Sequence, residues 1–472
     1  MRRRLILILM LMILTGCASL APERERPDMP VPGDWLERAQ FNATGSDVGQ
    51  LGWRDVFLDP ALQELISTAL NENRSLRQAA LAMDKAMAQF GIARADRIPN
   101  VDASGRTSTT RFPADLRSGI EGIDRQWSVG LGVTSFELDF FGRVRNLEES
   151  ALEQYLATEE ARRAVHISLV SQIARVYLAL AGDRENLALS RDTLRSRQAS
   201  LDLTMAKLAN GLATELERHQ AEEVVAVAQA EVARLKAQVA MDENALAVLV
   251  GVPVSGLKLP AQVIDDVAVR ESIAPGLPSD LLTRRPDILE TEHLLWAAGA
   301  EIGAARAAFF PRIGLTTTAG LVSLELTDLF DSAQRTWAFV PSVTMPIFDA
   351  GRNRARLDAA KAEQKIRIAR YEQIIQNAFR EVADALAKNQ GYAGQVEAQA
   401  RRVHSAGQSR ILVDQRYQAG LESAFAVHDA ERTLFAARQD LLSVRLARKF
   451  TLVELFAALG GGWEEKGGLS AY

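Results

Sequence analysis

The fold is decided by residues 143–210, which read RVRNLEESALEQYLATEEARRAVHISLVSQIARVYLALAGDRENLALSRDTLRSRQASLDLTMAKLAN. This stretch contains no proline and one internal glycine, Gly182, so nothing in it forces a helix to end. Apolar side chains recur along it with a period of about 3.6 residues, the period of one helix face. The predicted helix is roughly 100 Å long. No compact domain has a core of that length, so the rest of the chain must supply partners for a rod.

The composition excludes several classes of protein. The chain has 472 residues, of which 47% are apolar, and this excludes general disorder. A net charge of −5 gives no reason to expect nucleic acid as a partner. One cysteine excludes a disulfide framework or a cysteine metal site within one chain. The five histidines are scattered and no phosphate-binding glycine loop occurs, so we predict no enzymatic activity, no metal site and no catalytic residues.

The N-terminus has the pattern of a secreted lipoprotein. Arg2, Arg3 and Arg4 precede an apolar run that is too short to span a bilayer, and Leu14-Thr15-Gly16-Cys17 follows. The tetrapeptide resembles the bacterial lipobox, which implies removal of residues 1–16 and a covalent diacylglycerol and N-acyl lipid on Cys17. Ala18 after the cysteine implies sorting to the outer membrane of a Gram-negative bacterium. The alternative is an ordinary signal peptide with a chance cysteine.

Two segments, residues 100–140 and 312–348, change from the helical period to a period of two. Apolar and small polar residues alternate there, as in β-strands, and each segment is predicted to form a hairpin. A phase shift between Val133 and Phe136 predicts a β-bulge. Each strand has about 11 residues, close to the length that crosses a bilayer as a tilted strand.

The chain is an internal duplication. Gly142, Gly211 and Gly251 recur 209 residues later as Gly351, Gly420 and Gly460. Each copy is predicted to contain a helix, a hairpin, a long helix and a further helix. The predicted organisation is an extended segment 17–60, a first repeat 61–251 (helix 61–97, hairpin 100–140, helices 143–210 and 212–250), an equatorial linker 252–284, a second repeat 285–460 (hairpin 312–348, helices 351–419 and 421–459) and a tail 461–472.

The lengths of these segments predict an architecture. The two shorter helices of a repeat together nearly match its long helix, so we expect them to stack end to end, antiparallel to it. The strands at one end alternate apolar-out and small-polar-in, as in a membrane β-barrel. Four strands cannot close, and unpaired strand edges are not tolerated in lipid, so several chains must share one barrel. Three chains give twelve strands and a channel, whereas two leave almost no lumen. The alternative is a small soluble sheet.

Four further stretches are residues 53–62, 284–288, 304–313 and 346–351. They resemble stretches of the outer-membrane efflux proteins, the TolC/OprM-like outer-membrane factors of tripartite pumps, in their lipoprotein branch. The resemblance implies a mainly α-helical homotrimer with a 12-stranded barrel in outer-membrane lipid, continuous with a periplasmic α-barrel. It implies a passive exit duct for drugs or other small molecules. It also implies two protein partners, a periplasmic adaptor and an inner-membrane transporter of the resistance-nodulation-division class, which supplies the energy.

The resemblance also implies a constriction at the periplasmic tip, where the Gly211 and Gly420 turns lie. By position, it makes Glu422 and Asp429 the gate candidates. They are seven residues apart, so we expect them to share a helix face and to form cation-favouring rings of carboxylates in a trimer. Glu215 and Glu217 are secondary candidates, and ordinary solvated charges are the alternative. The expected adaptor-docking residues are Gly211, Leu212, Ala213, Thr214, Gly420, Leu421 and Ser423.

Two other functions fit parts of the sequence. One is the outer-membrane component of a type I protein secretion system. The lipobox and the Arg284–Ile288 stretch favour the efflux branch over this alternative. The other, from a different class, is a structural envelope lipoprotein without a pore, which leaves the four alternating strands unexplained.

Overall fold

The computed structural model describes residues 19–27, 46–47, 51–113, 122–256, 259–260, 263–271, 273–274 and 281–462. The predicted signal peptide and Cys17 lie outside these residues, as do much of the N-terminal segment, parts of the linker and the tail beyond residue 462. The chain forms two compact units. Of the described residues, those within 19–27, 82–159 and 290–372 form the strand-bearing unit, and those within 46–81, 160–289 and 373–462 form the helical unit. Neither unit coincides with a sequence repeat, because each takes segments from both.

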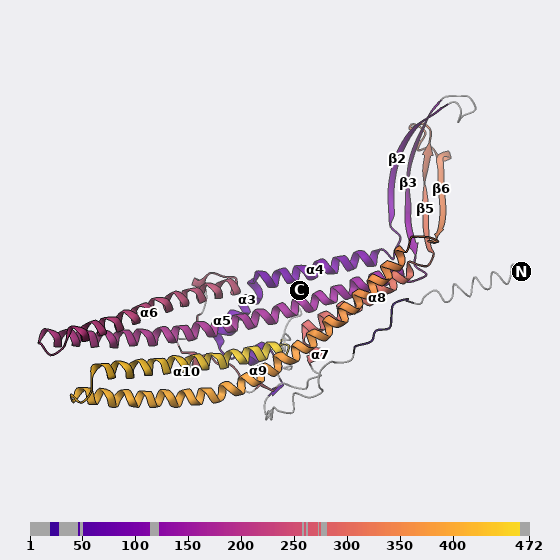
Figure 1. The fold of residues 1–472 in the computed structure, drawn as a ribbon. Coiled ribbons are helices and arrows are strands. Elements are labelled where there is room, and N and C mark those ends of the chain that lie inside the picture. The colour runs from indigo at the N-terminus through magenta and orange to yellow at the C-terminus, as the bar shows by residue number, and fades with distance from the viewer. Residues whose placement is uncertain are drawn as a thin grey trace. The chain divides into compact units, whose positions relative to one another are not determined.

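Nine α-helices account for most of the described chain, and four of them form two long antiparallel hairpins (Figure 1). The two long helices, α5 and α9, have 67 residues each and confirm the predicted rods. The helix bounds are α2 Trp53–Val56, α3 Pro60–Glu72, α4 Arg74–Ala95, α5 Arg143–Ala209, α6 Glu215–Val250, α7 Leu281–Arg284, α8 Pro286–Ala307, α9 Arg352–Gln418 and α10 Ala424–Ala458. Short 3-10 turns are η3 Val254–Gly256, η4 Ile264–Asp266 and η6 Ser332–Gln334.

The single helix predicted over residues 61–97 is wrong, because the chain breaks it at Asn73. Asn73 has an extended backbone (φ −68°, ψ 128°) and its N–H closes α3 by donating to Ala69 O. Its side-chain oxygen accepts a 3.0 Å hydrogen bond from the Leu76 N–H, which caps α4. Asparagine favours such caps because its short side chain replaces a backbone partner at a helix end.

The last helix of each repeat begins three residues later than predicted. Thr214 and Ser423 have extended backbones and cap α6 and α10 with their side-chain oxygens. The cap residue lies outside the regular helix, so the predicted starts at 212 and 421 fall in the preceding turns.

All six glycines that mark the duplication have the left-handed backbone conformation. Gly211 and Gly420 have φ values of 71° and 73°. The other two pairs behave alike, with φ values of 73° and 84° for Gly142 and Gly351 and of 85° and 90° for Gly251 and Gly460. This region is unfavourable for residues with a Cβ, so the repeated glycines reflect repeated backbone geometry.

The strand-bearing unit contains a four-stranded antiparallel sheet in the order β2-β3-β5-β6. The strands are β2 Val101–Phe112, β3 Gly122–Leu138, β5 Arg312–Ser323 and β6 Arg335–Thr344. β3 begins at Gly122, which lies opposite Phe112 of β2. The predicted bulge is confirmed by a register shift between Val133 and Phe136. A two-stranded parallel sheet, β1 Ser46–Asp47 with β4 Ile273–Ala274, belongs to the helical unit.

In the helical unit, the shorter helices of each repeat meet end to end, as predicted. Asn73 Nδ2 donates a 2.7 Å hydrogen bond to Leu249 O, near the end of α6. In the second repeat, an Arg285 guanidinium nitrogen donates a 2.8 Å bond to Ala458 O, at the end of α10. A Cβ on Gly251 would lie 2.6 Å from Glu72 O, so the close approach itself requires glycine.

The core of the helical unit lies around these junctions. Phe57 and Phe456 are fully buried or nearly so and pack edge to face with 5.1 Å between ring centroids. The linker contributes to this core, because Leu58 N donates to Ala268 O and Arg270 N donates to Val56 O, each at 2.9 Å. Among the described helices, α5 alone has a stretch long and apolar enough to cross a membrane, but 56% of that stretch is buried inside the protein. We assign it to helix packing.

Candidate functional site

The sheet has the side-chain pattern of a membrane surface. On the edge strand β6, Trp337, Phe339 and Val343 are exposed by 78%, 59% and 68%. These residues alternate in sequence, so they share one face of the strand. The register extends that face onto β5, where Ala319, Thr317 and Ile313 lie opposite them. Large apolar side chains exposed in a row point to lipid rather than water as their surroundings.

Polar contacts join the end of β3 to the start of α5. Arg143, the first residue of α5, donates from Nε and a terminal nitrogen to the Glu137 carboxylate at 2.8 and 2.6 Å. Asp139 accepts a 2.8 Å bond from the Arg145 N–H, which occupies one free donor at the start of α5. The ion pair with Glu137 outweighs burial and raises the pKa of Arg143. The end of β3 and the start of α5 therefore form one rigid connection.

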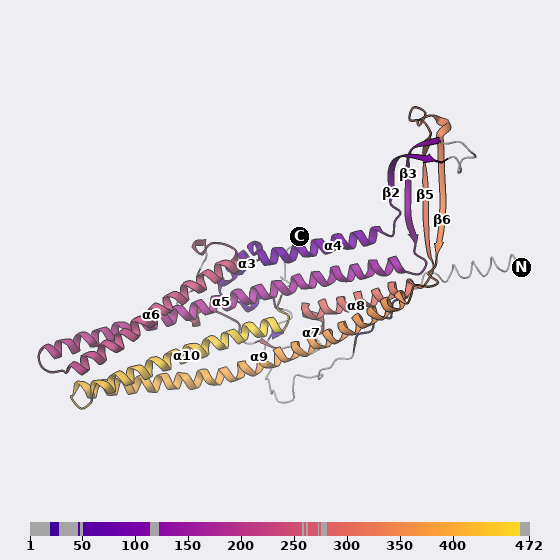
Figure 2. The ribbon, with the colours of Figure 1, turned by 45° about the horizontal axis from the view of Figure 1, so that its top comes forward.

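The turns α5–α6 and α9–α10 lie at the same end of the helical unit (Figures 1 and 2). One hydrogen bond is the same in both turns. Leu212 N donates to Lys207 O at 2.8 Å, and Leu421 N donates to Arg416 O at 2.9 Å. The two leucines are exposed by 77% and 68%. An exposed leucine at each turn offers an apolar contact to a partner.

Among the acidic candidates, the two near the first turn have local roles. Glu217 accepts a 2.7 Å bond from the Thr214 N–H, and Glu217 N donates to Thr214 Oγ1 in return. These bonds lower the pKa of Glu217. They form a capping box at the start of α6. Glu215 pairs with Arg218 on the same helix at 2.7 Å.

The expectation that Glu422 and Asp429 share a helix face is wrong. Glu422 lies in the turn before Ser423, the cap of α10, so helical periodicity does not relate it to Asp429. Glu422 is 3.4 Å from Arg416 Nε, and Asp429 is 2.6 Å from a terminal nitrogen of Arg432. Within the described residues, no hydrogen bond or ion pair joins the two carboxylates. Each is next to a positive charge instead.

The sequence interpretation missed a contact between the repeats at this end. Lys207 Nζ lies 2.8 Å from the Tyr417 hydroxyl and 4.7 Å from the centre of its ring. Lys207 is in the last turn of α5 and Tyr417 in the last turn of α9. The bond therefore ties the two long helices just before their turns. In the sequence, both residues lie shortly before a repeated glycine, Lys207 before Gly211 and Tyr417 before Gly420. This position was the only sign of the contact.

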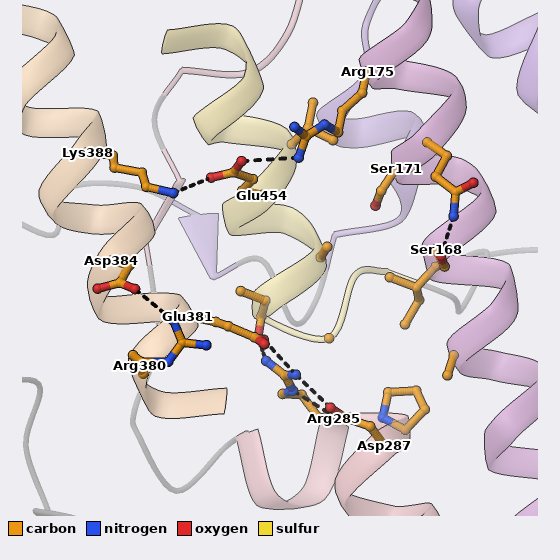
Figure 3. A pocket seen from close by; sticks show the side chains of 18 residues that line it. Ser168, Ser171, Arg175, Arg285, Asp287, Arg380, Glu381, Asp384, Lys388 and Glu454 are labelled. Atoms are coloured by element: carbon orange, nitrogen blue, oxygen red, sulfur yellow. Dashed lines mark hydrogen bonds and ion pairs between the residues drawn. The ribbon is translucent and has the colours of Figure 1, made fainter. Parts of the chain in front are cut away.

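A charged cavity of about 590 Å³ lies at the second helix junction (Figure 3). Arg285, 7% exposed, contacts the carboxylates of Asp287 and Glu381 at 2.7 and 2.9 Å. Burial acts to lower the pKa of Arg285, but these ion pairs raise it overall. Across the cavity, Glu454 bridges Arg175 and Lys388 at 3.1 Å each. This paired network holds helices together and gives the Arg284–Ile288 stretch a structural role.

The family model for outer membrane efflux proteins matches residues 65–252 and 277–461. The chain belongs to that family. The toluene efflux pump outer membrane protein TtgC of Pseudomonas putida is 43% identical over 461 residues, 97% of this chain and 95% of the relative. The cation efflux system protein CusC of Escherichia coli is 43% identical over 455 residues, covering 96% and 97%. A solved membrane protein of Pseudomonas aeruginosa is 41% identical with a TM-score of 0.90, covering 96% of this chain and all of that one.

Membership in the outer membrane efflux protein family confirms the predicted fold class, mainly helical with a four-stranded membrane sheet. This efflux protein is the outer-membrane channel component of an efflux system in a Gram-negative bacterium, and it has a large periplasmic part. The exposed aromatic residues Trp337 and Phe339 lie on one face of β6 in this sheet. The helical unit contains the periplasmic turns.

Proposed function

We propose that three copies of this efflux protein form one 12-stranded barrel and a continuous periplasmic duct. The observation that carries the proposal is the sheet itself. Its outer strands, β2 and β6, pair with no further strand within the described residues. Unpaired backbone groups at a strand edge are costly in lipid, so both edges require a partner. Three copies supply twelve strands, the smallest multiple of four above eight that leaves a lumen.

The test of this assembly is the mass of the purified protein. Native mass spectrometry in detergent is expected to show three chains. A folded protein that stays monomeric, or that assembles as a dimer, contradicts the proposal.

We infer that the channel is anchored by a diacylglycerol and an N-acyl lipid on Cys17. The sequence Leu14-Thr15-Gly16-Cys17 supports this, and so does the chain that follows it. Ser19 Oγ donates a 2.8 Å bond to Asn146, three residues into the helix that leaves the sheet. The described chain that follows Cys17 therefore lies beside the start of that helix. Mass spectrometry of the mature protein is expected to find both lipids, and a Cys17→Ser variant is expected to lack them.

The proposed partners are a periplasmic adaptor at the two turns and an inner-membrane transporter that supplies energy. The exposed side chains of Leu212 and Leu421 support docking at the turns, together with Gly211, Ala213, Thr214, Gly420 and Ser423. TtgC is named for toluene efflux and CusC for cation efflux, yet each is 43% identical to this chain. Channels of similar sequence are therefore named for different substrates. We therefore place substrate selection in the transporter, and the channel conducts passively without catalysing a reaction or binding a metal.

We propose a gate at the turns, formed by Glu422 and Asp429 of three chains. Carboxylates repeated around a three-fold axis favour cations in the constriction. Glu217 is used by the cap of α6, so it is not central to this gate. Glu215 pairs with Arg218 much as Asp429 pairs with Arg432, and it stays a secondary candidate. The arginines beside Glu422 and Asp429 reduce the negative charge of the closed constriction.

A further inference from the structure

A second cavity, of about 930 Å³, lies in the helical unit between α5, α6 and α10. Its volume is at the upper end of the range for sites that enclose a drug-sized molecule. Apolar side chains form much of its lining, including Phe425, Phe435, Val224 and Val227. The ion-paired cavity in Figure 3 differs in having most of its charges matched.

Three buried polar atoms of this lining have no hydrogen-bond partner among the described residues. They are Ser190 Oγ, Arg197 Nε and His428 Nδ1. Ser190 and Arg197 are only 2% and 9% exposed, and they lie seven residues apart on one face of α5. Each of the three atoms can carry a hydrogen. Buried polar groups normally have partners, so three unpaired donors among the residues that line one cavity require an explanation.

The charge of Arg197 is also poorly compensated. One of its terminal nitrogens donates a 3.2 Å bond to Val224 O, and the guanidinium lies 5.9 Å from the ring centre of Phe435. Burial lowers the pKa of Arg197, because the nearby Glu431 does not offset the loss of water. Glu431 is itself 3.3 Å from Arg410.

The other charges of the lining do not neutralise Arg197. Glu231 pairs with Arg234 at 2.7 Å, and Asp429 pairs with Arg432 at 2.6 Å. Glu223, the remaining carboxylate of the lining, is solvent-exposed. A partly open, largely apolar cavity with one unmatched cation and unpaired donors in its lining residues is complementary to an apolar molecule that carries a negative group.

We propose that this cavity binds an amphipathic organic anion, an aromatic or aliphatic body with one carboxylate. The carboxylate accepts hydrogen bonds from Arg197 and Ser190, with His428 as a third donor. The body of the molecule lies against Phe425 and Phe435. The site is formed within one chain and goes beyond the proposed exit duct, since it would hold a ligand in the helical wall rather than conduct it.

The test uses naphthoate as the probe and the full-length lipidated protein in lipid nanodiscs. Isothermal titration calorimetry is expected to show saturable binding at one site per chain, after subtraction of empty nanodiscs. Arg197→Gln is expected to weaken binding by about 10- to 100-fold, the usual effect of losing charged hydrogen bonds. Arg197→Lys keeps the charge but loses Nε, and its affinity is expected to lie between those of wild type and Arg197→Gln. The matched control is Arg195→Gln, because Arg195 is exposed and on the same helix.

A neutral analogue, naphthylmethanol, separates charge recognition from apolar partition. The affinity of wild type for naphthylmethanol is expected to be no higher than the affinity of Arg197→Gln for naphthoate. Thermal unfolding checks the fold, and Arg197→Gln is expected to unfold at or above the wild-type temperature, because it removes a poorly compensated buried charge. Equal binding by wild type and Arg197→Gln overturns the proposal, as does equal binding of the neutral analogue. Absence of saturable binding also overturns it, including the case in which a neighbouring chain fills the cavity.

Discussion

The side chain of Asn73 donates a 2.7 Å hydrogen bond to the backbone carbonyl of Leu249, where two helices of the first repeat meet. The equivalent position in the second repeat, Arg285, makes the same kind of bond to Ala458 O at 2.8 Å. Carbonyls at a helix C-terminus lack partners within the helix, so both side chains fill the same need. The second junction differs because Arg285 also carries a buried charge.

This difference predicts unequal costs of substitution. Arg285→Ala removes the ion pairs to Asp287 and Glu381 and the hydrogen bond to the Ala458 carbonyl, and is expected to cost about 2–3 kcal/mol. Asn73→Ala removes a cap and one bond and is expected to cost about 1 kcal/mol. Thermal unfolding of the solubilised protein measures both. Arg380→Ala is the control, since its pair with Asp384 is exposed. Equal losses of stability in all three variants would contradict the larger role assigned to Arg285.

A carboxyl pair between α5 and α6 predicts a pH dependence. Burial and the adjacent Asp242 raise the pKa of Asp183 to about 7. A raised pKa means that the folded state binds the proton more tightly than the unfolded state. The contribution of this pair to stability is therefore complete below about pH 4, near the unfolded pKa, and is lost as the pH rises through 7.

The variant Asp183→Asn is expected to flatten this dependence, because the amide cannot ionise. Unfolding temperatures of wild type and variant, measured from pH 5 to pH 8, should diverge as the pH rises, with the variant higher at pH 8. Asp192→Asn is the control, since Asp192 is exposed on the same helix. If the unfolding temperature of wild type falls no more than that of the variant between pH 5 and pH 8, Asp183 and Asp242 do not share a proton.

The bond between Lys207 and Tyr417 predicts an effect on gating. Tyr417→Phe removes the hydroxyl but keeps the ring, so it loses a hydrogen bond to a charged group worth roughly 1.5–3 kcal/mol. If the bond holds the two long helices in the closed arrangement, the ratio of open to closed channels rises by about tenfold or more. Recordings in planar bilayers measure the open fraction. Tyr392→Phe, on the same helix, is the control, and an unchanged open fraction in Tyr417→Phe contradicts the role.

The sequence predicted the long elements of the fold because they depend on local period and on glycine. The 67-residue helices, the six left-handed glycines and the bulge between Val133 and Phe136 are all confirmed. The break at Asn73 was missed because an asparagine is also tolerated within a helix, and its capping role depends on the partner at Leu249. The family was recognisable from short stretches spread over the chain.

The functional site was less predictable, because it depends on packing between distant helices. The spacing of Glu422 and Asp429 appeared helical, but the cap at Ser423 places Glu422 outside α10. The arginines that accompany these carboxylates were in the sequence, yet their pairing follows from rotamers and turn geometry. The cavity around Arg197 requires α5, α6 and α10 together, which no local pattern reveals.

The most direct test of the proposed duct is single-channel conductance of the purified protein in a planar bilayer, compared with the Glu422→Ala/Asp429→Ala double variant. Small, cation-preferring current steps are expected from the wild type. The double variant is expected to give larger steps with less cation preference, because it removes the carboxylates from the constriction. Equal currents from both proteins would show that the gate lies elsewhere. No current steps from folded, trimeric protein would contradict the duct itself.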